Sequence, residues 1–322
     1  MPNQLKNENS PYLKQHENNP VNWLPWSKKS LEKAKNLTKP IFLSVGYASC
    51  HWCHVMAHES FENLDTAKIM NEKFINIKVD REERPDLDSV FQKSLTILTG
   101  AQGGWPLSMF LDENGVPFTG GTYFPPTESH GRPGFKQVLE NVSQVYSENR
   151  EKIISQKSQM KLVFKELNKK TAVLKQDLEP FVERIMDYLD NENGGFKGAP
   201  KFPQFYIFDT IFYFYNKNKN NKFFNAVEKL LLNISSKGIY DHLEGGIARY
   251  TVDDKWVVPH FEKMLYDNIL YVNLLNQFIL KSNNNYLISK LIQTINFINN
   301  EFVSKDNFLG SAYDADSEGT EG

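Results

Sequence analysis

Cysteine is scarce in this chain, because its 322 residues include only Cys50 and Cys53. Two cysteines with two residues between them cannot form a structural disulfide framework, so the pair indicates redox or metal chemistry. Long apolar runs are also missing, since none approaches the roughly 20 residues that a membrane-spanning helix needs. Residues 1–9 are polar and lack the apolar centre of a secretory signal. We therefore expect a cytoplasmic protein with no membrane partner.

An excess of charge of either sign is absent as well. Lys and Arg number 37 and Asp and Glu 39, which gives a formal net charge of -2. No basic stripe alternates with aromatic residues, so nucleic acid is not expected as a partner. Hydrophobic residues make up 40% of the chain and aromatic residues 13%, enough for sizeable cores. The length favours two domains.

The first 150 residues alternate between short strands and helices. After an irregular lead-in, Ser27 caps a helix that runs to about Leu37. Apolar runs bounded by turn residues predict strands at 41–45, 74–80, 107–111 and 116–118. A hairpin signal precedes the last of these strands. Helices are expected between and after these strands, at 50–61, 65–73, 87–98 and from 135 onward. This order predicts a mixed sheet covered by helices, an α/β domain over 1–150.

From about residue 134 the chain is expected to be almost wholly helical. The Lys-, Gln- and Ser-rich stretch 151–177 predicts a helical connection to a second domain, 178–322. That domain repeats a weak motif, Asp-x-x-x-Gly-Gly followed by an apolar residue, at Asp190 and Asp241, with a fainter copy at Asp306. Such a period predicts stacked helical hairpins or an α/α toroid. A closed ring would need more sequence, so we expect the array to be incomplete here.

The stretch Cys50-His51-Trp52-Cys53-His54 allows several chemistries. As a redox pair it follows a buried strand and opens a helix, whose N-terminus stabilises a thiolate at Cys50. Cys53, one turn inward, would resolve a mixed disulfide, and a protonated His51 would favour the thiolate further. The sequence Cys-x-x-Cys-His also fits covalent attachment of a c-type haem, which requires export and a mostly helical domain around the haem. A zinc site of both cysteines with His54 or His58 is cramped on one helical turn.

Two inert buried thiols are the remaining interpretation. We favour the redox pair, with Cys50 and Cys53 as catalytic residues supported by His51 and Trp52, and we expect no metal and no cofactor. Downstream, Trp105-Pro106 opens the strand 107–111, where a thioredoxin-like sheet places a cis-proline beside the dithiol. Trp105 and Pro106 are therefore the predicted binding edge for an extended client.

Several motifs resemble one family. In the first half they are Ser10-Pro11-Tyr12-Leu13, Gln15-His16, Asn19-Pro20-Val21-x-Trp23, Ser49 to Met56, Lys78 to Glu83, Gly103 to Pro106 and Gly120 to Pro125. In the second half they are Pro200 to Pro203, Gly245 to Tyr250, Pro259 to Asn268 and Tyr313 to Gly319. Together they resemble the spermatogenesis-associated thioredoxin-domain family, which is widespread in bacteria and archaea. The resemblance implies a thioredoxin-like domain followed by a six-hairpin α/α toroid like that of sugar epimerases and glycosidases.

The chain departs from ordinary thioredoxins at two points. The residues between the cysteines are His and Trp rather than Gly and Pro. Ser44 stands six residues before Cys50, where thioredoxins keep a buried acid that helps proton transfer. These departures leave oxidation, isomerisation and thiol sensing open beside disulfide reduction.

The helical half carries a second group of polar residues. His242, Arg249, His260, Glu262 and Asp267 gather in a short stretch and are candidates for a cavity that binds a sugar-like ligand. The leading hypothesis is thiol–disulfide exchange with a protein client or a small thiol. The alternatives are a carbohydrate-active epimerase or isomerase with a regulatory thioredoxin-like part, and a non-catalytic interaction protein.

Overall fold

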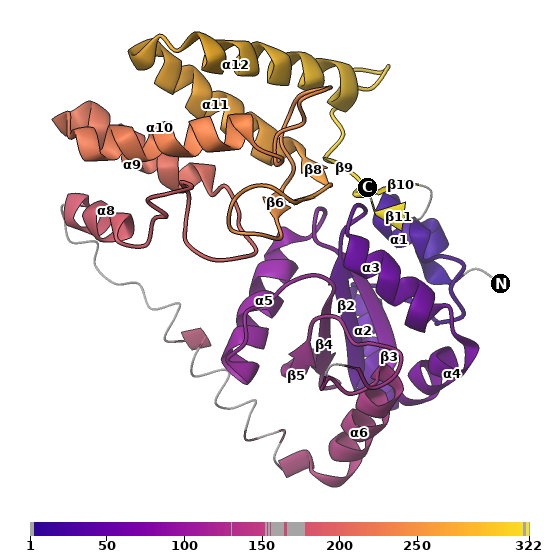
Figure 1. The fold of residues 1–322 in the computed structure, drawn as a ribbon. Helices are drawn as coiled ribbons and strands as arrows, with labels where there is room; N and C mark the ends of the chain where they lie inside the picture. Colours follow the sequence, from indigo (N-terminus) through magenta and orange to yellow (C-terminus); the bar gives the residue numbers. More distant parts are fainter. Residues whose placement is uncertain are drawn as a thin grey trace. The chain divides into compact units, whose positions relative to one another are not determined.

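The computed structural model describes residues 3–129, 131–151, 153, 155, 164–165, 178–317 and 320–321. The chain divides into two compact units, Met1–Thr171 and Ala172–Gly322, which Figure 1 colours along the sequence. Most of the predicted connection at 151–177 lies outside the described residues, so the predicted domain boundaries stay a prediction. Among the helices that are described, none combines the length and apolar character needed to cross a membrane.

The first unit is built on a five-stranded mixed sheet. Its strands lie in the order β1 (Leu24–Pro25), β3 (Ile75–Asp80), β2 (Ile41–Gly46), β4 (Leu107–Leu111) and β5 (Pro117–Gly121). β1 and β2 run parallel to β3, whereas β4 is antiparallel to both β2 and β5. The predicted mixed sheet is confirmed, and four of its strands lie where the apolar runs placed them.

Helices cover both faces of this sheet (Figure 1). They are α1 (Pro11–Gln15), α2 (Lys28–Leu37), α3 (His51–Met56) with a π-helical extension (Ala57–Phe61), α4 (Leu64–Lys73), α5 (Pro85–Thr99) and α6 (Phe135–Glu148). The Ser27 hydroxyl accepts the Ser30 N–H at 3.1 Å and so caps α2, as its position before the helix predicts.

Alternation along the strands gives the two sheet faces different cores. Odd-numbered residues of β2 and β3, such as Leu43 and Ile77, join an aliphatic cluster with α2 and α5. Even-numbered residues face a layer of aromatic rings, where Phe42 lies 5.4 Å from Phe135 and 6.3 Å from Phe61 between ring centroids. The helix that starts after Cys50 therefore sits over an aromatic face.

The lead-in at 1–27 is more ordered than expected. It contains a short 3-10 helix (Gln4–Asn7), α1 and the edge strand β1, and Trp23 is fully buried. The Ser10 hydroxyl donates to the Asp80 carboxylate at 2.6 Å and ties α1 to the end of β3. The prediction of an irregular segment is wrong in this respect. The second sheet face needs an apolar cover, and this segment supplies it with aromatic rings.

The second unit consists mainly of helical hairpins. Its helices are α8 (Glu179–Met186), α9 (Phe205–Asn218), α10 (Asn221–Ser236), α11 (Leu265–Ser282) and α12 (Asn285–Phe297), the last extended by a π-helical segment (Ile298–Phe302). Only a few residues separate α9 from α10 and α11 from α12, which makes each pair a hairpin. The predicted helical-hairpin character of this half is confirmed.

Short strand pairs interrupt the helices of the second unit. β6 (Tyr250–Thr251) pairs with β7 (Pro259–His260), β8 (Lys263–Met264) with β9 (Ala312–Tyr313), and β10 (Asp316–Ser317) with β11 (Thr320–Glu321). The expectation that this half is almost wholly helical is therefore wrong in detail. Strands of two residues are too short for a period-2 pattern to show in the sequence.

Candidate active site

Cys50 and Cys53 form a disulfide at the start of α3. Their sulfurs are 2.10 Å apart and their Cα atoms 5.2 Å apart. Cys50 is the N-cap residue of α3, and its Sγ accepts the Cys53 backbone N–H at 3.2 Å. Because a helix brings residues three apart onto one turn, the two sulfurs meet at the first turn of α3. The same N–H would stabilise a thiolate on Cys50 after reduction.

The predicted edge beside this pair lies just before β4. The Trp105–Pro106 peptide bond is cis, as the sequence order predicts. The Trp105 ring lies 5.9 Å from that of Tyr47, and its indole N–H donates to Asp88 at 2.9 Å. The Arg81 guanidinium covers the same ring at 4.2 Å. Trp105 is therefore fixed on three sides within the first unit.

The two residues between the cysteines differ in their surroundings. Trp52 is 47% exposed, and its ring lies 5.1 Å from that of Tyr123. The His51 ring lies 5.5 Å from the Trp52 ring. Just beyond the second cysteine, His54 Nε2 is 2.8 Å from the Ala48 carbonyl oxygen. The predicted supporting residues His51 and Trp52 thus lie on the first turn of α3, between the two cysteines.

Gly46 and Tyr12 lie directly beneath Cys53. A Cβ atom on Gly46 would stand 2.3 Å from the Tyr12 hydroxyl oxygen and 2.7 Å from Cys53 Sγ. The hydroxyl and the sulfur therefore approach the same point, which only glycine leaves open. A cavity of about 250 Å³ opens here and is lined by Tyr12, Gln15, His16, Cys53, His54, Ala57, His58 and Glu62.

Lys78 is buried below this cavity, in the aromatic layer of the sheet. Its Nζ lies 5.0, 4.7 and 4.6 Å from the ring centroids of Tyr12, Trp23 and Phe61. The Ser44 hydroxyl accepts a hydrogen bond from Nζ at 3.1 Å. Within the described residues no carboxylate is close enough to form an ion pair with this amine. Burial lowers the pKa of Lys78 well below its ordinary value.

The groups around Lys78 are shifted in the same sense, toward neutral forms. Burial, and after it the charge of Asp80, raises the pKa of Tyr12, an effect that the nearby Ser44 hydroxyl opposes. Burial, and after it Lys78, lowers the pKa of His16 well below its ordinary value. Sequence reasoning noted Ser44 but missed Lys78, because polar residues at alternate strand positions usually face solvent. The signal that could have found Lys78 was the alternation of strands and helices. It predicts a sheet covered on both faces, so that strand residues on either face are buried.

The structure brings three of the predicted residues of the second unit together. Arg249 Nη1 donates to Glu262 Oε1 at 2.8 Å, and His260 Nε2 lies 3.8 Å from the same oxygen. Glu262 is fully buried, and Tyr250 stacks on the His260 ring at 4.8 Å.

The other two predicted residues lie on other elements. His242 follows Asp241 in the second Asp-Gly-Gly turn, where its Nε2 is 3.1 Å from the Lys237 carbonyl oxygen. Asp267 stands in the first turn of α11. Whether His242, Arg249, His260, Glu262 and Asp267 serve one cavity stays a prediction.

The repeated motif forms two matching turns. Asp190 Oδ1 accepts the N–H groups of residues 192 and 193, and Asp241 Oδ1 accepts those of 243 and 244. Asp190 Oδ2 binds Lys201 Nζ at 2.6 Å, and Asp241 Oδ2 binds Lys263 Nζ at the same distance. The paired glycines that follow have positive φ angles between 72° and 96°. The faint third copy at Asp306 is built differently, because Ser304 N–H there donates to the Phe308 carbonyl.

Hydrogen bonds decide the charge of Asp190. Burial raises the pKa of this carboxyl, but the hydrogen bonds from Lys201 and from the backbone N–H groups of 193 and 192 outweigh burial and lower the pKa well below the usual range. The carboxylate therefore stays charged and holds the ammonium of Lys201.

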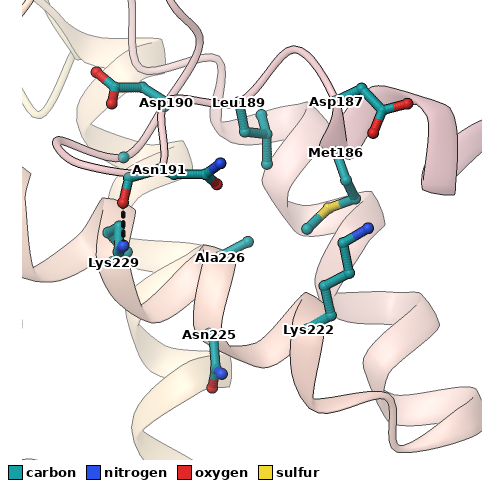
Figure 2. A pocket seen from close by; sticks show the side chains of 11 residues that line it. Met186, Asp187, Leu189, Asp190, Asn191, Lys222, Asn225, Ala226 and Lys229 are labelled. Carbon is teal, nitrogen blue, oxygen red and sulfur yellow. Dashed lines mark hydrogen bonds between the residues drawn. The ribbon is translucent and has the colours of Figure 1, made fainter.

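A second cavity, of about 620 Å³, lies beside the first of these turns. Figure 2 shows Lys222 and Lys229 reaching from α10 toward the segment that ends α8 and enters the turn, and Lys229 donates to the Asn191 carbonyl. None of the residues predicted from the sequence to bind a ligand lines this cavity.

Comparison with known proteins identifies relatives of the whole chain. Residues 2–165 match the family model Thioredox_DsbH, described as a protein of unknown function, DUF255. An uncharacterised protein of Caenorhabditis elegans is 42% identical over 82% of this chain and 37% of its own length. Spermatogenesis-associated protein 20 of Homo sapiens is 36% identical over 98% of this chain and 42% of its own length. The chain thus spans about two fifths of the curated relatives that it matches.

Solved structures are more distant. A sugar epimerase from a ruminal bacterium has a TM-score of 0.37 at 17% identity, over 44% of this chain and 38% of its own. A DsbH oxidoreductase has a TM-score of 0.28 at 20% identity, over 39% of this chain and 83% of its own. Likenesses of this size assign no function. The family match over half the chain does assign membership, and this protein belongs to the thioredoxin-domain family that includes spermatogenesis-associated protein 20.

Proposed function

We propose that the first unit carries out thiol–disulfide exchange through Cys50 and Cys53. The observation that supports this most directly is the disulfide between the two cysteines at the first turn of α3, immediately after a buried strand. A dithiol in this position can be oxidised to a disulfide and reduced again, because one sulfur caps the helix while the other lies one turn further along it.

Cys50 is the attacking residue in this proposal. As a thiolate it forms a bond to one sulfur of a client disulfide, and the other client sulfur leaves with the electron pair. Cys53 then attacks Cys50 Sγ, which releases the second client sulfur and leaves the Cys50–Cys53 disulfide. Two electrons pass from the protein dithiol to the client disulfide, and the reverse sequence oxidises a client dithiol.

The client in this proposal is a protein thiol or disulfide, or a small thiol. The backbone beside Pro106 would pair with an extended client segment, and the exposed Trp52 ring would add apolar contact. Fixing of the Trp105 ring by Tyr47, Arg81 and Asp88 supports this assignment, because a docking edge must keep its shape.

Two matched cysteine variants test the exchange. Cys50→Ser should abolish exchange with glutathione disulfide, whereas Cys53→Ser should form a stable mixed disulfide through Cys50. Mass spectrometry of both variants and a glutathione redox titration of the unmodified chain measure this. Equal exchange by Cys50→Ser and the unmodified chain would contradict the proposal.

The cluster in the second unit favours a second candidate, proton transfer on a sugar-like ligand by His260. The imidazole lies between the Tyr250 ring and the Glu262 carboxylate, which in turn is held by Arg249. Such an arrangement orients a general base. His260→Ala should then abolish an isomerase activity that Cys50→Ser retains. Absence of both activities from the unmodified chain, together with a stable partner in pull-down experiments, would favour a non-catalytic interaction protein.

A further inference from the structure

A row of polar side chains crosses the sheet directly under α3. Ser44 on β2 stands opposite Lys78 on β3 and opposite Ser108 on β4. All three side chains are buried, and the Ser108 hydroxyl lies 3.9 Å from the sulfur of Met56 on α3. Residues paired in register share a sheet face, so Lys78 and Ser44 face the helix that carries Cys53.

A buried lysine without a carboxylate is unusual and costly unless it is uncharged. The aromatic rings of Tyr12, Trp23 and Phe61 surround Lys78 Nζ, and its hydrogen bond goes to the Ser44 hydroxyl. Asp80, the nearest acid along the strand, is engaged by the Ser10 hydroxyl and the Glu82 N–H. Burial favours the uncharged amine, whereas the three rings favour the ammonium, so the two forms are brought closer in free energy and the uncharged form has a lone pair that can accept a proton.

Tyr12 connects the lysine with the disulfide. Its ring lies beside Lys78 Nζ, and its hydroxyl approaches Cys53 Sγ at Gly46. Among the described residues the buried Tyr12 hydroxyl completes no hydrogen bond of ordinary geometry in this oxidised state, although the Ser44 hydroxyl lies close enough to lower its pKa. Reduction of the disulfide would create a thiol or thiolate at Cys53 to which the hydroxyl could bind.

We propose that Lys78 is the proton acceptor for the resolving thiol of Cys53, through the hydroxyl groups of Tyr12 and Ser44. The inference rests on the proposed exchange and refines it. In the resolving step the Cys53 thiol loses its proton to Lys78, and its sulfur forms a bond to Cys50 Sγ. The bond between Cys50 and the client breaks, and the departing client thiolate takes up a proton. In the opposite direction Lys78 returns the proton to Cys53.

This role replaces the buried acid of ordinary thioredoxins at the position of Ser44. Among the described residues, the ionisable groups near Lys78 are Tyr12 of α1, His16 just after it, Asp80 of its own strand and Cys53 of α3. Burial shifts both Tyr12 and His16 toward their neutral forms, since it raises the pKa of the phenol and lowers the pKa of the imidazole.

The test uses the reduced full chain and 5,5′-dithiobis(2-nitrobenzoate) as the disulfide. Attack by Cys50 releases a first thionitrobenzoate, and attack by Cys53 on the mixed disulfide releases a second. Lys78→Met should leave the first release unchanged and slow the second on the order of a hundredfold at pH 7. The deficit should shrink as the pH approaches about 8.5, where an ordinary thiol ionises without help. The exposed substitution Lys68→Met on α4 is the matched control and should change neither release.

The two releases separate the inference from the proposed function. A second release in Lys78→Met that keeps the rate and pH profile of the unmodified chain would overturn the role of Lys78 alone. A first release that persists in Cys50→Ser would overturn the exchange itself and the inference with it. If Lys78→Met does not fold, Tyr12→Phe and Ser44→Ala remove only the bridging hydroxyls. Each should slow the second release about tenfold, and unchanged rates in both would overturn the inference.

Discussion

Lys78 of the first unit and Lys201 of the second are two lysines in nearly the same degree of burial, with exposed fractions of 1% and 2%. Each ammonium or amine lies against a tryptophan ring, Trp23 at 4.7 Å and Trp256 at 5.0 Å. They differ in their polar partners. Lys201 binds the Asp190 carboxylate and the Asp254 carbonyl, whereas Lys78 binds one hydroxyl, that of Ser44.

The partner, not the burial, separates a structural lysine from a reactive one. An ammonium paired with a carboxylate keeps its proton, because each charge stabilises the other in a low dielectric. Burial without a counter-charge lowers the pKa of an amine, although aromatic rings nearby favour its ammonium form, and such an amine can take up or release a proton during a reaction. The comparison therefore predicts opposite results when each lysine is replaced by methionine.

The largest expected effect on stability is that of Lys201→Met. The substitution leaves the Asp190 carboxylate mostly buried without its cation, so we expect the free energy of unfolding of the second unit to fall by about 3 kcal/mol. Native-state hydrogen exchange of α9 and α10 measures this without assuming that the whole chain unfolds as one unit.

Lys197→Met provides the control for that prediction. Lys197 is exposed and donates only to the Asp187 carbonyl, so its loss should change the free energy by less than about 0.5 kcal/mol. Acid should mimic Lys201→Met. The lowered pKa of Asp190 means that its contribution is complete above the unfolded pKa of about 3.9 and is lost as the pH falls through the folded value. Equal free energies of unfolding for Lys201→Met and Lys197→Met would mean that pairing with Asp190 adds no stability. The distinction between Lys201 and Lys78 would then fail.

Lys78→Met should change the free energy of unfolding in the opposite direction from Lys201→Met. Replacing an unpaired amine by an apolar side chain of similar length should leave the first unit as stable at pH 7 or more stable. In the unmodified chain burial lowers the folded-state pKa of Lys78 below the unfolded value of about 10.4, so the unfolded state binds more protons and the stability of the first unit should rise from pH 7 to pH 9. Urea titrations at both pH values should show this rise in the unmodified chain and in Lys68→Met, and its loss in Lys78→Met. A rise of equal size in Lys78→Met would mean that Lys78 is charged in the folded state.

The sequence predicted the parts of this molecule that depend on local patterns. Four strands of the sheet follow bounded apolar runs and the cysteine pair follows its spacing, whereas the cis bond at Pro106 was expected only by likeness to thioredoxin-like sheets. The role of the lead-in was not predictable, because β1 and α1 are too short to show a period. β1 extends the sheet at its edge, whereas α1 and Trp23 help to cover a sheet face formed by strands far away in the chain.

The lysines were missed for a related reason. Lys78 looks like a solvent-facing strand residue until the rings of Tyr12 and Trp23 are placed over it, which needs the tertiary structure. The repeat drew attention to Asp190 and Asp241 but not to their partners, since Lys201 and Lys263 stand at unequal distances along the chain. Contacts made at one fixed spacing leave a pattern in a sequence, whereas contacts made by loops of different length do not.

The smallest expected effect on stability is that of Asp241→Asn, which compares the two matching turns of the repeat. Asp241→Asn keeps the oxygen that accepts the backbone N–H groups of its turn but loses the charge that Lys263 binds. The Lys263 and Asp241 side chains are 16% and 28% exposed, against 1% and 15% for Lys201 and Asp190, so water can replace part of the lost interaction. We expect a loss of about 1 kcal/mol by hydrogen exchange of α11, at least twofold less than for Asp190→Asn. Asp306→Asn, in the copy that lacks this turn, should change nothing. If it destabilised as much as Asp241→Asn, the paired lysine would not be what stabilises the turn.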